Sequence, residues 1–134
     1  MRVKGWRSIL ADYVAGAARA PYQPGTADCA LFAAGAVDAI TGSDHRRVWA
    51  GRYRCVTGGQ RILRRAGHAD VAALVAAHLP EVPVAYARPG DLAALSGTDG
   101  LALGVVQGEG IYVLTPAGLA TVPLLTALRA FRVG

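Results

Sequence analysis

The chain has 134 residues, of which 53% are hydrophobic and 17% are charged, and its formal net charge is +5. This composition excludes a disordered or low-complexity chain. It predicts one globular domain over residues 1–134, with a core that needs no disulfide or metal.

The apolar segments are too short to cross a bilayer. Four polar side chains interrupt the alanine-rich stretches: Asp28, Asp38, Asp70 and His78. Residues 1–7 lack the apolar run and the cleavage site of a secretion signal. We therefore expect a protein made in the bacterial cytoplasm, without a membrane span, in which Cys29 and Cys55 are free thiols.

Helical periodicity marks the first part of the chain. Trp6, Leu10 and Tyr13 recur at helical spacing, which predicts an amphipathic helix ending near Gly16. After a loop over residues 21–25, Asp28 is a suitable N-cap for a second helix that ends at Thr41-Gly42. This helix is apolar on more than one face, so we expect it at the centre of the fold.

Arginine supplies nearly all of the positive charge, because Lys4 is the only lysine, and it is concentrated in the middle of the chain. Seven arginines follow the break at residues 42–44: Arg46, Arg47, Arg52, Arg54, Arg61, Arg64 and Arg65. The cluster suits an anionic partner or a solvated surface. We predict no nucleic-acid binding, because no aromatic interleaving, zinc-finger spacing or helix-turn-helix pattern accompanies the charge.

Two further helices are predicted in this middle region. A loop over residues 51–53 precedes a short helix that starts after Thr57 or Gly58 and ends at Ala66. Asp70 can cap another helix, which continues to Leu79.

Short apolar runs separated by Gly, Pro and Asp replace the helical pattern from Val82 onward. We predict strands in the runs 82–86, 90–95, 101–107, 111–114 and 118–122, then a turn at 123–125 and an edge strand over 127–133. Helices followed by strands predict an α+β fold, with N-terminal helices packed on a small antiparallel sheet or barrel.

Cys29 is the residue with the clearest chemical potential. It lies on the first turn of the predicted central helix, where free N–H groups and the positive end of the helix dipole stabilise a thiolate. A thiolate can attack a carbonyl, but catalysis also needs a base and a group that orients the base. Against this stands the neighbouring Asp28 carboxylate, which opposes the thiolate.

These motifs resemble the papain-like NlpC-type cell-wall peptidase superfamily. In that superfamily Asp-Cys opens the central helix and Gly-Asp-Leu begins the sheet, as Asp28-Cys29 and Gly90-Asp91-Leu92 would here. The resemblance implies a papain-like fold with Cys29 in the position of the nucleophile.

A closer resemblance is to a family of small proteins found in phage tail gene clusters. Its features are an Asp-Cys-x-x-Phe-Ala-Ala helix, a Thr-Gly-x-Asp turn, Gly-Arg-Tyr and a terminal Arg-Val-Gly. Here these are residues 28–34, 41–44, 51–53 and 132–134, so the resemblance spans nearly the whole chain. It implies a tail-associated protein whose partners are other tail proteins.

The resemblance also indicates that the catalytic base is missing. The peptidases carry the base at the start of a His-Val-Gly-Ile strand, a register that here places Ala102. The next strand, at 111–114, is apolar where the superfamily has its third polar residue. The histidines lie elsewhere: we expect His45 in a surface loop, His68 at a helix end and His78 partly buried and hydrogen-bonded.

The remaining thiol and metal candidates are weaker. Cys29 could be a buried, inert small residue, because free cysteines are among the most buried residue types. Cys55 has arginines nearby but no predicted helix start, so we interpret it as a structural or incidental thiol. No Cys-x-x-Cys or His-x-x-x-His spacing occurs, and we predict no metal and no cofactor.

The leading hypothesis is a catalytically degenerate NlpC-like component of a phage tail or phage-derived particle, acting as a structural or interaction subunit. We predict Asp28, Tyr22, Arg52 and Arg54 as binding residues. The alternative is an active cysteine hydrolase that cleaves peptidoglycan peptides during DNA entry, with Cys29 as nucleophile and an off-motif histidine as base. A third reading is a glycan- or peptide-binding module without turnover.

Overall fold

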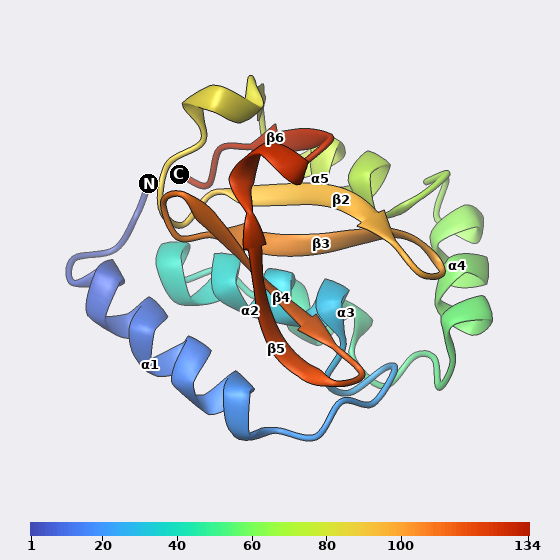
Figure 1. The fold of residues 1–134 in the computed structure, drawn as a ribbon. Coiled ribbons are helices and arrows are strands. Elements are labelled where there is room, and N and C mark those ends of the chain that lie inside the picture. The colour runs from blue at the N-terminus through green and yellow to red at the C-terminus, as the bar shows by residue number, and fades with distance from the viewer.

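Helices and strands occupy separate halves of the sequence and form separate layers (Figure 1). The computed structural model describes residues 1–134. Five helices from the N-terminal half pack on a six-stranded antiparallel sheet from the C-terminal half, which confirms the predicted α+β class. No helix is long and apolar enough to span a membrane.

The helices are α1 (Trp6–Arg19), α2 (Cys29–Thr41), α3 (His45–Trp49), α4 (Val56–Arg65) and α5 (Val71–His78). The predicted end of α1 near Gly16 is wrong, because the alanines that follow it carry the helix on to Arg19. Helix α3 was not predicted. Its first N–H groups, those of His45 and Arg46, are capped by the distant Asp38 carboxylate at 2.7 and 2.9 Å.

Helix α2 is the central helix, as predicted. The Asp28 carboxylate accepts the Leu31 N–H at 2.9 Å, and Gly42 ends the helix in the left-handed conformation with φ of 72°. Helix α1 packs closely against it at Gly35, where an added Cβ would lie 2.1 Å from the Tyr13 hydroxyl. That hydroxyl donates to the Phe32 carbonyl at 2.8 Å, which joins the two helices.

The strands are β1 (Glu81–Val82), β2 (Leu92–Gly97), β3 (Gly100–Val106), β4 (Gly110–Thr115), β5 (Gly118–Pro123) and β6 (Arg129–Phe131). Their order is β1-β6-β2-β3-β4-β5, so the sheet is open rather than a barrel. The prediction of an edge strand at the C-terminus is wrong, because the two-residue β1 pairs with β6 and covers it. Residues 84–86, predicted as strand, form a 3-10 turn (η1, Val84–Tyr86).

The core lies between α2 and one face of the sheet. Phe32, Ile40, Val105 and Phe131 are at most 2% exposed and belong to one cluster with α5. A smaller cluster on the sheet contains Ala93, Leu95, Val106, Ile111 and Val113, and Cys29 and Ala102 pack against it. Burial of these apolar side chains stabilises the two layers against each other.

An ion pair between Arg2 and the buried Asp91 lies where the two ends of the chain meet, side by side in Figure 1. The Arg2 guanidinium donates to the Asp91 carboxylate at 2.9 Å, the Val133 carbonyl at 2.8 Å and the Pro89 carbonyl at 2.7 Å. Asp91 is fully buried and also accepts the N–H groups of Arg88 and Val133. The Gly-Asp-Leu and Arg-Val-Gly motifs therefore meet at this carboxylate.

We predict that Asp91→Asn lowers the free energy of unfolding by about 3 kcal/mol, because it leaves the Arg2 charge without its partner in a buried site. Urea denaturation measures the change. The matched control is Glu81→Gln, which breaks the exposed Glu81–Arg129 pair and leaves the unfolding midpoint unchanged. Equal effects of the two substitutions would contradict a structural role for the buried pair.

Candidate functional site

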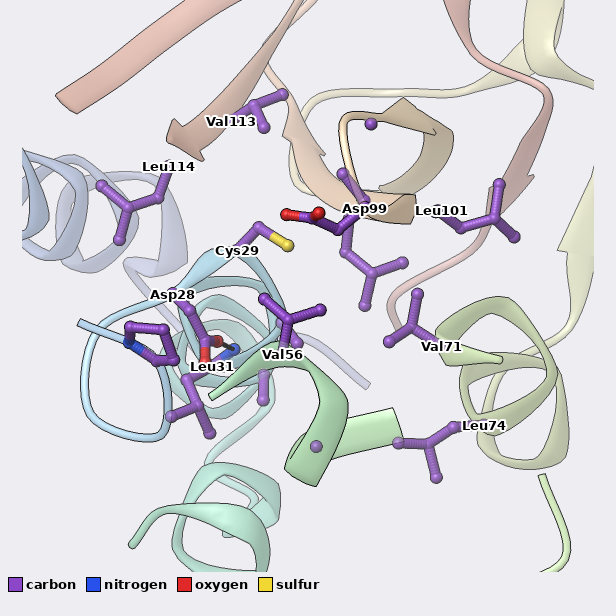
Figure 2. A pocket seen from close by; sticks show the side chains of 18 of the residues that line it. Asp28, Cys29, Leu31, Val56, Val71, Leu74, Asp99, Leu101, Val113 and Leu114 are labelled. Atoms are coloured by element: carbon purple, nitrogen blue, oxygen red, sulfur yellow. Dashed lines mark hydrogen bonds between the residues drawn. The ribbon is translucent and has the colours of Figure 1, made fainter. Parts of the chain in front are cut away.

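A cavity of about 430 Å³ lies between α2, α4, α5 and the sheet (Figure 2). Of its 37 lining residues 24 are hydrophobic, so its wall is mainly apolar. Cys29 lies on this wall at the start of α2. The size is in the range of cavities that hold small ligands, about 300 to 1,000 Å³.

The Cys29 thiol is in a poor environment for a nucleophile. Burial raises the pKa of the thiol above its ordinary value of 9.0. The Leu103 backbone N–H acts in the opposite direction, and the Asp28 carboxylate adds to the increase. Because burial is the largest of these effects, Cys29 is a protonated thiol near neutral pH.

Asp28 is a structural carboxylate with all its bonds directed inward. Its side chain accepts the backbone N–H groups of Leu31 and Gly25, each at 2.9 Å, and the Tyr53 hydroxyl. Burial and this hydrogen bond raise the pKa of Tyr53, so the phenol stays protonated and continues to donate. Asp28 is thus engaged with three segments of the chain, none of which carries a base.

No histidine reaches the thiol by a hydrogen bond. His45 and His78 also line the cavity, where their rings meet edge to face with centroids 5.3 Å apart. His68 is outside the lining. The prediction of a partly buried, hydrogen-bonded His78 is wrong: it lies in the last turn of α5, exposed, and its ring makes no hydrogen bond.

Ala102 and Cys29 both line the cavity and pack against the same apolar cluster. Ala102 precedes Leu103, whose N–H acts on the thiol. A histidine in this position would be near the sulfur, but alanine cannot accept a proton. The neighbouring β4 presents buried Val113 and Leu114 to the cavity, and its polar lining residue, Thr115, donates to the Gly118 carbonyl at 2.8 Å.

The other predicted site residues separate into two groups. Tyr22 lines the cavity together with Asp28 and Cys29. Arg52 and Arg54 are exposed and lie outside the lining; the Arg52 guanidinium stacks on the Trp49 ring at 5.0 Å. The structure therefore brings Tyr22, but neither arginine, to the thiol.

Cys55 has a structural role, which was one of the two predicted for it, but the prediction that no helix starts there is wrong. It is the N-cap of α4, and its exposed sulfur accepts the Gly58 N–H at 3.4 Å. The expectation of two free cysteines is confirmed. Sequence reasoning missed this cap because cysteine is an unusual N-cap residue.

Tyr53 and Asp99 also belong to the site, and neither was predicted. Tyr53 is tightly enclosed by glycines: an added Cβ at Gly25 would lie 1.8 Å from its carbonyl oxygen, and one at Gly59 would lie 3.1 Å from its ring. Asp99 is an exposed residue in the turn between β2 and β3, next to α4, where the Gln60 Nε2 donates to its carbonyl at 3.0 Å. The glycines around Tyr53 were the available sequence signal for this site.

The fold and the site define an α+β domain with a cysteine-headed central helix and a mainly apolar cavity. Residues 1–133 match the family described as Domain of unknown function (DUF6950), and the chain belongs to this family. No curated protein matches the chain.

We predict that Cys29 reacts with iodoacetamide more slowly than Cys55 near neutral pH, because Cys29 is desolvated and Cys55 is exposed. Because burial raises the pKa of the Cys29 thiol above 9.0, its rate should still be rising with pH at 9.0 instead of levelling off there. Ala102→His should accelerate the Cys29 reaction by about tenfold near neutral pH, because an imidazole beside the sulfur lowers the thiol pKa. Mass spectrometry of each peptide gives the rates.

The Cys55 rate in the same sample is the internal control, and Ala102→Asn separates the effect of an imidazole from that of a larger polar side chain. A wild-type Cys29 that outpaces Cys55 near neutral pH would contradict the inert-thiol interpretation.

We predict that Tyr53→Phe lowers the free energy of unfolding by about 2 kcal/mol, because the buried Asp28 carboxylate loses a donor. Amide exchange should rise most in α4, which follows Tyr53 directly. Tyr112→Phe is the matched control, because the Tyr112 hydroxyl donates to no other group of the chain. Similar losses in both variants would assign the effect to packing rather than to the hydrogen bond.

Proposed function

We propose that this protein is a catalytically inactive NlpC-like subunit of a phage tail or phage-derived particle, with a structural or interaction role. The observation that carries the proposal is the protonated Cys29 thiol beside Ala102, without an imidazole in hydrogen-bond contact. The resemblance of the motifs to the phage-tail-cluster family supplies the tail context.

The surroundings of the thiol support loss of catalysis. Acyl transfer requires a base for the thiol proton and donors for the developing oxyanion. Asp28, the nearest acidic group, is held by Tyr53 and two backbone N–H groups, and it raises the thiol pKa rather than lowering it. The polar groups next to the thiol, Asp28 and its three donors, are therefore groups that stabilise the fold.

The surface supports an interaction role. Of the seven arginines between residues 46 and 65, only Arg47 has an ion-pair partner, Asp44 at 3.5 Å. Arg46 and Arg52 donate to the backbone carbonyls of Thr26 and Val48. The other four guanidinium groups, of Arg54, Arg61, Arg64 and Arg65, belong to exposed residues and are available to carboxylates on a neighbouring tail protein. The two outer strands of the open sheet, β1 and β5, offer further backbone groups for docking.

We predict that the chain is present in purified particles of the phage that encodes it, and that Cys29→Ala changes neither its incorporation nor infectivity. A subunit without a catalytic thiol does not need the sulfur. Quantitative mass spectrometry of purified particles and plaque counts measure the two outcomes. The purified protein should release no peptide from cell wall.

The matched control is Cys55→Ala, which removes the other thiol. Peptide release by the wild-type protein that Cys29→Ala abolishes and Cys55→Ala leaves intact would overturn the proposal in favour of a cysteine hydrolase. Absence of the chain from the particles would overturn the structural role.

A further inference from the structure

The cavity exists because α4 stands away from the body of the fold (Figure 1). Two side-chain hydrogen bonds join the α4 region across the gap. The Tyr53 hydroxyl donates to Asp28, and the Gln60 Nε2 donates to the Asp99 carbonyl at 3.0 Å. Between these links, Val56 and Ile62 of α4 face the cavity rather than a packed neighbour.

The charges on the cavity wall have a sign opposite to that of the chain. The sequence holds 14 lysines and arginines, but none lines the cavity. The acidic lining residues are Asp28 and Asp99, and Figure 2 shows the Asp99 carboxylate turned into the cavity on the side of the Cys29 sulfur. The Asp99 carboxylate has neither an ion pair nor a hydrogen bond within the chain, whereas Asp28 is fully engaged.

The two carboxylates converge on Tyr22. Burial raises the pKa of this phenol, and Asp28 and Asp99 each raise it further. No cationic group opposes them at Tyr22. Aromatic rings line the same cavity, from Tyr22, Tyr53 and Trp49. Aromatic faces beside carboxylates attract an organic cation, and an apolar wall accommodates its hydrocarbon part.

We propose that this cavity binds a cationic amphiphile, a ligand with a hydrocarbon body and an ammonium head. The body lies among apolar side chains such as Val56, Leu74 and Leu101, and the head lies between Asp99 and the ring of Tyr22. The inference goes beyond the proposed function, because it requires neither assembly into a particle nor chemistry at Cys29.

An anionic amphiphile would meet the opposite electrostatics. Its anionic head would lie near Asp28 and Asp99. The arginines closest in the sequence to Val56, Arg54 and Arg61, are exposed and outside the lining. Non-specific attraction to a chain of net charge +5 would favour an anion over a cation. A preference for the cationic probe would therefore reflect the charges of the cavity and not the net charge of the chain.

Calorimetric titration with octylammonium, octanol and octanoate near neutral pH tests the proposal, with octanol kept below its solubility limit and the two ions below their micelle concentrations. We expect octylammonium to bind roughly three- to tenfold more tightly than octanol, and octanoate to bind more weakly than either. Asp99→Asn should reduce octylammonium affinity to the level of octanol and leave octanol affinity unchanged.

The location of the ligand is tested by filling the cavity. Val56→Trp places a large ring on the cavity side of α4 and should abolish binding of both octylammonium and octanol. Val48→Trp is the matched control, because Val48 is 56% exposed and outside the lining. Absence of binding by all three probes, equal affinities for them, tighter binding of octanoate, or loss of binding in both tryptophan variants would overturn the proposal.

Discussion

One buried carboxylate, that of Asp28, holds together the part of the molecule that carries the site. It caps α2 through Leu31, fixes the preceding loop through Gly25, and accepts the hydroxyl of Tyr53, the residue that leads into α4. A carboxylate that is only 6% exposed is costly to desolvate, and these three donors offset that cost. The position of α2, the loop and α4, and hence the shape of the cavity, follow from this arrangement.

The same carboxylate limits the chemistry of Cys29. A helix N-terminus stabilises a negative charge by up to about 2 kcal/mol in favourable, partly buried sites. At Cys29 burial outweighs the backbone N–H groups, and the Asp28 charge acts in the same direction as burial. A papain-like site reverses this balance with an imidazolium beside the sulfur. With alanine at residue 102, the balance favours the neutral thiol.

The features predicted from the sequence are those determined by neighbouring residues. Asp28 caps α2 and Asp70 caps α5 through N–H groups three residues away, so both helix starts were predictable. Helix α3 depends on Asp38, which lies seven residues before His45. Strand β6 is covered by β1, and the paired residues Val82 and Ala130 are 48 positions apart in the chain. Contacts of this range leave no local pattern. Cys29 was therefore found from its helix, whereas Tyr53 and Asp99 were found only from the folded chain.

The arginine cluster gives the chain its positive charge but does not determine the charge of the cavity. Helix α4 is strongly amphipathic, with Leu63 buried and Arg61, Arg64 and Arg65 exposed, so its positive charge is on the face away from the cavity. A guanidinium on the cavity side would have to be desolvated, and Asp28 could not compensate it because its oxygens are already engaged. Apolar side chains therefore occupy that side of the helix, and the charge that remains in the cavity is carboxylate. The outer surface and the cavity of this protein thus present opposite signs, and each must be matched to its own class of partner.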